Sequence, residues 1–316
     1  MMNAGEAARW LREHDDYLIL THRRPDGDTV GSAAALCRGL RLLGKKAELF
    51  PNCQLPEKFA PCVEDLLGSG DPAGKTLISV DMAAENMLPY NAPELAGRTE
   101  FAVDHHASNT SYAPNTFVDP EAAACGELVY ALLQELGVTP DEKIAEALYI
   151  AVSTDTGCFR FANTTARSLH TAAACFAAGA DIHKWNRLLF LTRTPARLRL
   201  EAYLTEHTAF YMEGKVALCS LSRQVVEDCG AGEEDMDDIS GFPRDIAGVE
   251  IGVLLREVAD GIKISLRTYA PWNASDICAL LGGGGHANAA GATVKGTVQE
   301  ASSAVLDALR RCGAEV

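Results

Sequence analysis

Aspartate and histidine residues follow the ends of four hydrophobic segments, and this arrangement limits the folds that the chain can adopt. They are His22, Asp26 and Asp28, then Asp81, then Asp104, His105 and His106, and last Asp155. These side chains offer the oxygen and nitrogen ligands that Mn²⁺ and similar divalent ions accept. In an open α/β sheet, the carboxyl ends of parallel strands meet at one edge, where ligands bind. The sequence therefore predicts a two-metal hydrolytic site at the edge of an α/β sheet.

Short apolar runs alternate with Ala- and Leu-rich stretches in the first half of the chain. The runs expected to form strands are residues 17–21, 46–50, 76–80 and 100–103. Helices are expected at residues 32–44, 126–136, 142–152 and 166–179, the first of them opened by Gly31 and Ser32 after a non-helical Pro-Asp-Gly-Asp loop. Buried parallel strands of this length alternate with helices in α/β domains. We therefore expect a parallel sheet with helices on both faces.

The length of 316 residues suits two domains. Residues 1–190 would form the α/β domain that holds the metal site, and residues 191–209 would form a basic helical linker. Residues 210–316 would form a smaller α/β domain, with strands in KVALCSL, IGVLLREV and GIKISLRTYA. A glycine-rich segment, LGGGGHANAAGAT, separates these strands from a final helix near residues 299–311.

The net charge of −15 argues against a protein that grips long nucleic acid, because such proteins usually carry a basic stripe that contacts the phosphates. A short phosphorylated ligand is compatible with this charge if metal ions and a few arginines lie in a cleft. Part of the acidity lies in residues 233–238, which we expect to form a solvated loop.

The sequence shows no sign of membrane insertion or secretion. No apolar run approaches the roughly 20 residues of a membrane-spanning helix, and the N-terminal residues lack the basic start and apolar stretch of a secretory signal. The ten cysteines form no C-x-x-C pair and lie mostly in apolar surroundings. We expect them to be reduced and buried rather than to bind zinc, and we expect a cytoplasmic protein.

Each motif alone has a structural explanation without a metal. Pro-Asp-Gly-Asp at residues 25–28 is a common turn, and Asp81 or Asp155 could cap a helix. Asp104, His105 and His106 are more specific, because three ionisable residues at the end of a buried strand are costly without a compensating charge. The occurrence of all four motifs in order, each at an expected strand or helix end, favours the metal site.

These motifs resemble those of the DHH family of phosphoesterases, in which Asp104, His105 and His106 would form the signature. The second half resembles the associated DHHA1 domain, whose glycine-rich motif matches residues 282–291, GGGGHANAAG. The resemblance covers nearly the full length and is greatest to the nano-RNase and pAp phosphatase type. It implies an α/β fold with a parallel-sheet DHH domain and a smaller α/β DHHA1 domain. It also implies two Mn²⁺ ions and hydrolysis of short RNA or of 3′-phosphoadenosine 5′-phosphate (pAp).

The resemblance also implies a role for each motif residue. One Mn²⁺ would be held by His22, Asp26 and Asp81, and the second by Asp28, Asp81, His105 and Asp155. Asp81 would bridge the two ions. His106 would be a phosphate contact or a proton donor, and these two residues would be the catalytic ones. Asp104 would orient the histidines from behind. The candidates for substrate binding are Arg160, Arg267, Gly283, Gly284, Gly285 and His286.

Three departures from related families narrow the expected substrate. The sequence Ser265-Leu266-Arg267 replaces the lysine-rich signature of family II pyrophosphatases. The added nucleic-acid-binding module of RecJ-type exonucleases is absent, and Ala287 replaces a lysine often found after the glycine-rich motif. Hydrolysis of cyclic di-AMP or of its linear product pApA stays open as an alternative, and a non-catalytic nucleotide-binding protein is a more distant one. A homodimer is also left open.

Overall fold

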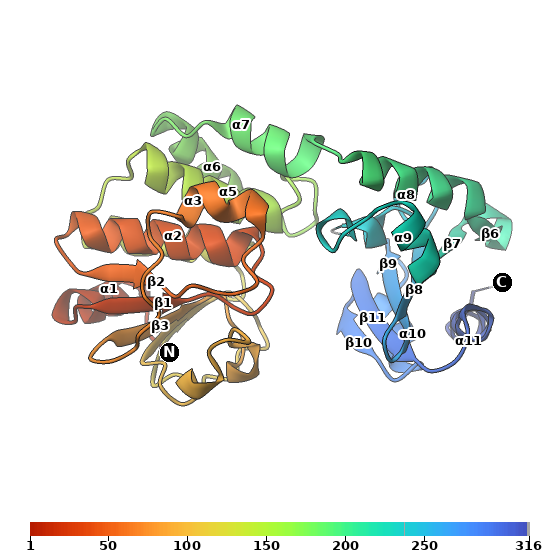
Figure 1. Ribbon diagram of the computed structural model, residues 1–316, viewed down its shortest axis with the longest axis horizontal. Helices are drawn as coiled ribbons and strands as arrows, with labels where there is room; N and C mark the ends of the chain where they lie inside the picture. The colour runs from red at the N-terminus through yellow and green to blue at the C-terminus, as the bar shows by residue number, and fades with distance from the viewer. Residues whose placement is uncertain (237, 315–316) are drawn as a thin grey trace. The chain divides into compact units, whose positions relative to one another are not determined.

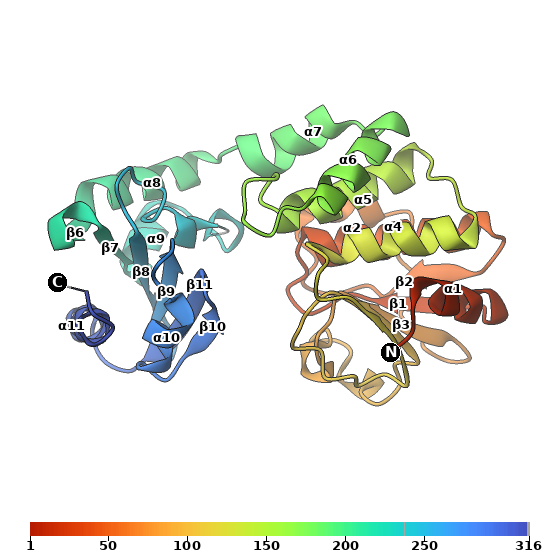
Figure 2. The ribbon, with the colours of Figure 1, turned by 180° about the vertical axis from the view of Figure 1, so that it is seen from behind.

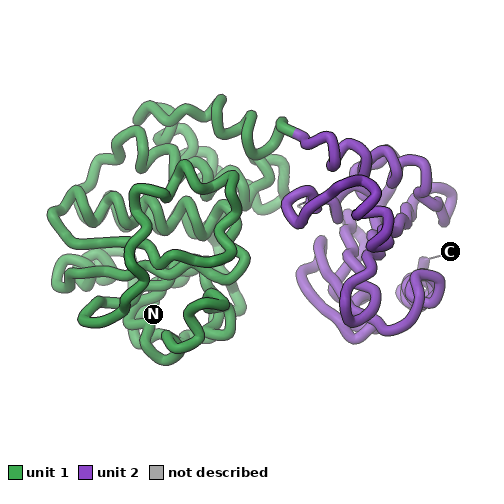
Figure 3. Tube along the Cα trace, in the orientation of Figure 1, with its two compact units in different colours: residues 1–192 green, residues 193–316 purple. Residues whose placement is uncertain are grey.

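The computed structural model of the chain describes residues 1–236 and 238–314, and it divides into two compact units. The first unit is Met1–Thr192 and the second is Arg193–Val316, coloured separately in Figure 3. The expected linker, residues 191–209, contains helix α8 (Pro195–His207), whose Leu200 and Leu204 pack with Cys219 and Leu221 of the second unit. Residue 237, part of the expected acidic loop, lies outside the described residues.

The first unit is built on a parallel sheet of five strands in the order β2-β1-β3-β4-β5 (Figure 1). The strands are β1 (Tyr17–Leu20), β2 (Ala47–Leu49), β3 (Thr76–Val80), β4 (Phe101–Asp104) and β5 (Asn115–Val118). The first four were expected from their apolar runs. The strand β5 was not, because its sequence Asn-Thr-Phe-Val carries only two apolar residues.

The helices of the first unit form layers on one side of this sheet. They are α1 (Ala4–Glu13), α2 (Gly27–Leu42), α3 (Ala60–Val63), α4 (Cys125–Leu136), α5 (Glu142–Asp155), α6 (Ala166–Ala177) and α7 (Ile182–Asn186), followed by a π-helical turn at Arg187–Leu191. Side chains of α1, α2 and α4 share a core with Ile19, Ile78 and Val103 of the sheet. Helix α5 packs on α2 and α4, as the two opposite views in Figures 1 and 2 show.

The other face of the sheet differs from the expectation of helices on both faces. Leu18, Leu20 and Leu77 of that face pack with Met82, Leu88 and Leu95. These last residues belong to the β3–β4 connection, which contains only two short 3₁₀ turns, Glu85–Met87 and Pro93–Leu95. The prolines at 89 and 93 are incompatible with the interior of a long helix in this connection.

The second unit is a sheet of six strands in the order β10-β11-β9-β8-β7-β6, in which only β7 and β8 pair in parallel. The strands are β6 (Ala209–Tyr211), β7 (Val216–Leu221), β8 (Ile251–Val258), β9 (Gly261–Thr268), β10 (Gly284–His286) and β11 (Ala289–Val294). Helices α10 (Ala274–Ala279) and α11 (Val298–Arg311) cover one face. Helices α8 and α9 (Arg223–Asp228) pack on part of the other.

The fold class expected from the sequence, an α/β unit with a parallel sheet and a smaller second α/β unit, is confirmed. All ten cysteines are free and most are buried, as expected. Among the residues that the structure describes, none of the helices is both long and apolar enough to span a membrane.

Gly31 lets α2 approach α5 closely. A Cβ atom at this position would lie 2.3 Å from the carbonyl oxygen of Ala147 and 2.8 Å from the backbone nitrogen of Ala151. Both contacts are with backbone atoms of α5, which cannot move away as a flexible side chain could. The close packing therefore requires glycine here.

We expect Gly31→Ala to lower the free energy of unfolding of the first unit by about 1–3 kcal/mol, because the added methyl group overpacks the α2–α5 interface. Gly5→Ala in α1 is the matched control, since its Cβ would come no closer than 3.5 Å to another atom outside its own helix. Urea unfolding of the two variants measures the difference. If both variants unfold at the same urea concentration, the α2–α5 interface accommodates a methyl group at Gly31 and the prediction is wrong.

Candidate metal centre

Three neighbouring strands and two helix ends bring the predicted metal ligands together. His22 follows β1, Asp81 follows β3, and Asp104 is the last residue of β4. Because β1, β3 and β4 are adjacent and parallel, their carboxyl ends form one edge of the sheet. Asp28 comes from the first turn of α2 and Asp155 from the last turn of α5. The predicted strand ends therefore converge as the sequence indicated.

Two of the predicted helix boundaries are wrong. Helix α2 begins at Gly27 rather than at Ser32, so Asp28 is helical and not part of a free loop. The reason is Asp26, which is the N-cap and accepts hydrogen bonds from the backbone of Asp28 and Thr29, each at 3.1 Å. Helix α5 extends through Asp155. Asp81 caps no helix, which removes the alternative explanation for that residue.

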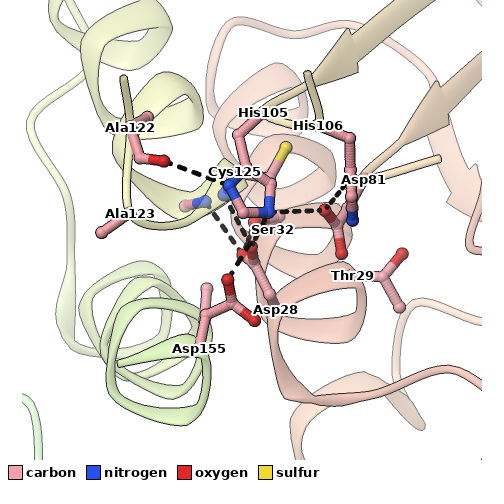
Figure 4. Close-up of polar contacts among 12 residues, drawn as sticks. Asp28, Thr29, Ser32, Asp81, His105, His106, Ala122, Ala123, Cys125 and Asp155 are labelled. Carbon is pink, nitrogen blue, oxygen red and sulfur yellow. Dashed lines mark hydrogen bonds and ion pairs between the residues drawn. The ribbon is translucent and has the colours of Figure 1, made fainter. Parts of the chain in front are cut away.

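The side chains form two clusters that Asp81 connects. The first cluster is His22, Asp26 and Asp81, and the second contains Asp28, His105 and Asp155. Asp81 also forms a third possible ligand group with His105 and His106. In the first, Nε2 of His22 lies 3.8 Å from Oδ2 of Asp81. In the second, Nε2 of His105 lies 3.4 Å from the other oxygen, Oδ1 of Asp81 (Figure 4). The two oxygens of Asp81 therefore face different clusters.

His105 also joins the members of the second cluster. Its Nε2 lies 3.7 Å from Oδ2 of Asp28 and 3.5 Å from Oδ2 of Asp155. His22 has the equivalent place in the first cluster, with its Nε2 3.6 Å from Oδ1 of Asp26. In both clusters a single imidazole nitrogen is surrounded by carboxylate oxygens.

Backbone carbonyls fix the protonation of these two histidines. Nδ1 of His22 lies 2.8 Å from the carbonyl oxygen of Arg23, and Nδ1 of His105 lies 3.1 Å from that of Ala122. A carbonyl oxygen only accepts hydrogen bonds, so Nδ1 carries the proton in both rings. A ring with its proton on Nδ1 presents Nε2 to the carboxylates, which is the arrangement of a metal-binding histidine.

The carboxylates carry more negative charge than their surroundings compensate. Asp81 is 2% exposed, and its Oδ1 makes no hydrogen bond within the described chain. Burial, and next the charge of Asp28, raise the pKa of Asp81 well above its usual value. Burial also raises the pKa of Asp155 to about 6. A buried set of aspartates with two correctly oriented histidines fits divalent cations with oxygen and nitrogen ligands.

Asp28 is the most enclosed of these carboxylates, and backbone groups of α4 hold it. Its Oδ2 accepts a hydrogen bond from the backbone of Cys125 at 2.6 Å, and its Oδ1 accepts one from Gly126 at 3.0 Å. Ser32 donates a third bond to Oδ1 at 2.9 Å. Helix α4 has no side-chain cap of its own, so Asp28 caps it from 97 residues away in the sequence.

Asp104 lies behind the histidines rather than inside a cluster. It is fully buried, and its Oδ1 accepts hydrogen bonds from Nδ1 of His106 at 2.7 Å and from the backbone of His105 at 2.9 Å. Asn109 donates to Oδ2 at 2.6 Å. The hydrogen bond to Asp104 raises the pKa of His106, whose side chain is one-third exposed beside the clusters.

The candidate substrate residues lie in both units. Arg160 follows α5 in the first unit, and its Nε donates to the carbonyl oxygen of Gly157 at 2.6 Å. Arg267 lies on β9 of the second unit and donates to Oγ of Ser240 at 2.9 Å. Arg267 forms no ion pair with a carboxylate within the described residues, so its charge is available to an anionic ligand.

A groove of about 350 Å³ lies beside Arg267 on one face of the second sheet. Lys263, Ser265 and Arg267 point into it from β9, because alternate residues of a strand share a face. Arg256 of β8 lies opposite Lys263 in the strand register. Ser240, Gly284 and Gly285 also line the groove, and His286 is exposed at the end of β10.

The four consecutive glycines have different reasons to be glycine. A Cβ atom on Gly283 would lie 2.1 Å from the carbonyl oxygen of Gly291, and one on Gly285 would lie 2.6 Å from that of Ala289. These two glycines are therefore required by the close pairing of β10 with β11. Gly284 has open space at its Cβ position, so close approach of a ligand explains it better.

Several residues around the site were not anticipated. Ser32, Asn109, Asn163 and Arg167 hold ligands or their neighbours by hydrogen bonds and ion pairs. Asn109 lies three residues after His106, but no local pattern in the sequence shows that an asparagine will reach a carboxylate. The hydrogen-bond and ion-pair partners of these four residues can be identified only from the three-dimensional structure.

Comparison with protein families gives two matches along the chain. The model of the DHH family, N-terminal domain, matches residues 16–152, and that of the DHHA1 domain matches residues 220–314. The chain is 37% identical over 296 residues to the bifunctional oligoribonuclease and PAP phosphatase NrnA of Thermus thermophilus, covering 92% of this chain and 88% of that protein.

Solved structures support the fold. An exopolyphosphatase-related protein from Bacteroides fragilis matches with a TM-score of 0.88 at 24% identity, covering 98% of this chain and 95% of that one. The exonuclease RecJ bound to manganese matches with a TM-score of 0.53 at 17% identity, covering 98% and 95%. At these identities the likeness shows a shared fold.

We expect the stability of the metal-free protein to fall as pH rises from about 4 to beyond about 6. The pKa of Asp155 is raised from 3.8 to about 6 in the folded state. Between these values the folded protein keeps a proton that the unfolded chain has lost, so this contribution is complete below about pH 4 and is lost above about pH 6. The raised pKa of His106 acts in the same direction.

Thermal unfolding in a chelator, for wild type and Asp155→Asn, measures this contribution as the difference between their pH profiles. The variant should show a weaker decline in Tm. Added Mn²⁺ should raise the Tm of wild type most at high pH, since an ion that binds only the folded state stabilises it. Identical pH profiles of the two proteins, or a Tm that Mn²⁺ leaves unchanged, would contradict this prediction.

Proposed function

The chain belongs to the DHH family of phosphoesterases, and from this premise we propose that it hydrolyses short oligoribonucleotides and pAp with two Mn²⁺ ions. The observation that carries the proposal is the position of Asp81, whose two oxygens face two separate histidine-containing clusters. A shared carboxylate between two ligand sets is the arrangement expected of a bridging ligand. The activity of the NrnA relative supports the choice of substrates.

We assign the first ion to His22, Asp26 and Asp81, and the second to Asp28, Asp81, His105 and Asp155. When bound, such ions neutralise charge on a phosphoryl group and lower the pKa of a coordinated water. The chain itself orients the ligands: carbonyl oxygens of Arg23 and Ala122 direct the two histidines, and α4 holds Asp28. Within each cluster the ligand atoms already lie within 4.8 Å of one another, so no rearrangement of these side chains is needed.

His106 is the proposed proton donor to the leaving oxygen. Asp104 accepts the hydrogen bond from Nδ1, which fixes the ring and favours its protonated form. In that form Nε2 also carries a proton, which it can donate, and the side chain is one-third exposed. A histidine with a raised pKa beside a hydrolytic site is suited to general acid catalysis near neutral pH.

The groove of the second unit is a proposed binding site for phosphates of a nucleotide ligand. Its volume of about 350 Å³ lies at the lower end of the range for small-molecule sites. Arg256, Lys263 and Arg267 offer positive charge to phosphates, and Arg267 presents a planar fork that suits two phosphate oxygens. Gly284 would allow the backbone to approach the ligand closely, and His286 and Arg160 are further candidate contacts.

The substrate preference is tested by a panel of pAp, pApA, cyclic di-AMP, a dinucleotide, a pentanucleotide and a long RNA, each assayed with Mn²⁺ and with a chelator. We expect Mn²⁺-dependent release of mononucleotide or phosphate from pAp and from the shortest RNAs. Preference for cyclic di-AMP would replace this proposal by a cyclic dinucleotide phosphodiesterase. Binding without turnover of any of them would favour a nucleotide-binding protein. A cytoplasmic location and a homodimer stay predictions.

Asp81→Asn should abolish hydrolysis of every substrate in this panel. Loss of a ligand shared by both ions should cost several kcal/mol of transition-state stabilisation, which is on the order of 10³-fold or more in rate. Asp65→Asn is the control, because Asp65 pairs with Arg38 away from both clusters. If Asp81→Asn keeps a tenth of the wild-type rate, the bridging assignment is wrong.

Arg267→Ala should raise KM for nucleotide substrates by about 10- to 100-fold while Mn²⁺ binding stays intact, because a charge-assisted hydrogen bond to phosphate is worth about 1.5–3 kcal/mol. Bis-p-nitrophenyl phosphate has no second phosphate for the arginine, so its hydrolysis should barely change. Steady-state kinetics on both substrates separates the two cases. Equal losses on both would place Arg267 at the reacting phosphate, and no loss on either would remove it from the site.

A further inference from the structure

Residues of the second cluster are tied to one segment of the chain, residues 119–127, which joins β5 to α4. Nδ1 of His105 donates to the carbonyl oxygen of Ala122 at 3.1 Å. The backbone groups of Cys125 and Gly126 donate to the two oxygens of Asp28. Figure 4 shows Ala122, Cys125 and Asp28 around the imidazole of His105. A shift of this segment would therefore move both His105 and Asp28.

Asn163 connects the same segment to the third residue of that cluster. Its Nδ2 donates to the carbonyl oxygen of Ala123 at 3.2 Å and to the carbonyl oxygen of Asp155 at 3.1 Å. The backbone that carries Asp155 is thus held against segment 119–127. Asp28, His105 and Asp155 all depend on the placement of this one segment.

Two residues of the first cluster, His22 and Asp26, do not depend on it. His22 is held by the carbonyl oxygen of Arg23, and its own carbonyl accepts a hydrogen bond from Asn52. Asp26 is held by the backbone at the start of α2. Within the described residues, no hydrogen bond joins either side chain to segment 119–127.

Arg167 of α6 holds the two ends of the segment together. Its guanidinium lies 2.5 Å from Oδ2 of Asp119 at one end and 3.1 Å from Oε2 of Glu127 at the other. The Glu127 side chain is fully buried, and Arg167 forms the one ion pair that the described residues give it. A buried carboxylate depends strongly on its cation. Arg167 therefore contacts a carboxylate at each end of the segment.

From these contacts we propose that Arg167 is a positioning residue for the second metal ion, acting through segment 119–127 on His105, Asp28 and Asp155. The proposal rests on the proposed two-metal function. Residues that orient metal ligands typically contribute 10- to 100-fold to metal affinity. Because the first cluster has its own supports, loss of Arg167 should affect one ion and spare the other.

The test is a titration of the full-length metal-free protein with Mn²⁺, followed by the electron paramagnetic resonance signal of free Mn²⁺. Wild type should bind two ions. Arg167→Met should bind one ion as wild type does and the second about 10- to 100-fold more weakly. Arg38→Met is the matched control, since Arg38 forms an ion pair of 2.6 Å with Asp65 and lies outside both clusters. It should leave both affinities unchanged.

The double variant Arg167→Met, Glu127→Met separates positioning from folding. It removes the buried carboxylate that Arg167→Met leaves without a cation, so its Tm should recover, while the second ion should still bind weakly. Recovery of metal affinity together with Tm would overturn the proposal, as would unchanged affinities in Arg167→Met, equal loss of both ions, or the same loss in Arg38→Met. Wild type that binds fewer than two ions would instead overturn the proposed two-metal function.

Discussion

Repulsion between buried carboxylates is the constraint on which the first unit depends. Asp28 and Asp81 are 1% and 2% exposed, and Asp155 lies beside them. Burial and the neighbouring negative charges raise the pKa of Asp28 and of Asp81 well above the usual value. Such groups persist in a folded protein only where hydrogen bonds or cations compensate their charge. The groups around these carboxylates each compensate part of their negative charge.

The compensation differs between the buried carboxylates Asp28 and Asp81. Asp28 receives hydrogen bonds from Ser32 and from two backbone groups at the start of α4, where the partial positive charge of the helix favours an anion. Asp81 receives none at Oδ1. Three histidines surround it. The Nδ1 protons of His22 and His105 are committed to carbonyl oxygens, and Nδ1 of His106 donates to Asp104. The raised pKa of Asp81 means that a proton compensates its charge in the metal-free protein. A bound cation would replace that proton, which is why a metal centre fits here.

The identity of the ligands could be predicted from the sequence, because each follows a recognisable apolar run and strands of one sheet end at a common edge. The support of the ligands could not. The bonds from α4 to Asp28 span 97 and 98 residues, and hydropathy patterns carry no information about such contacts. The start of α2 was also predicted wrongly. The Asp26 side chain caps the helix, so α2 begins at Gly27, earlier than the apolar periodicity indicated.

The glycine-rich motif could also be recognised in the sequence, but the reason for each glycine could not be predicted from it. Four glycines in a row indicated a ligand-binding loop, yet Gly283 and Gly285 are required where β10 pairs closely with β11. The strand pairing was not visible in the sequence, since Gly284–His286 has none of the β-branched or aromatic residues typical of strands. Gly282 and Gly284 both have open space at the Cβ position, but the φ of +76° at Gly282 already favours glycine, so Gly284 is the one that neither packing nor φ explains.

Net charge and groove size favour the same class of ligand. An anionic ligand that approaches a protein of net charge −15 is repelled except where cations lack carboxylate partners. In the second unit, Arg267 lies in such a place, in a groove of limited volume. A long strand would have to extend beyond the groove on a protein of net charge −15, without the phosphate contacts that supply most of the affinity. A ligand with few phosphates avoids that repulsion, so electrostatics alone already disfavours long nucleic acid.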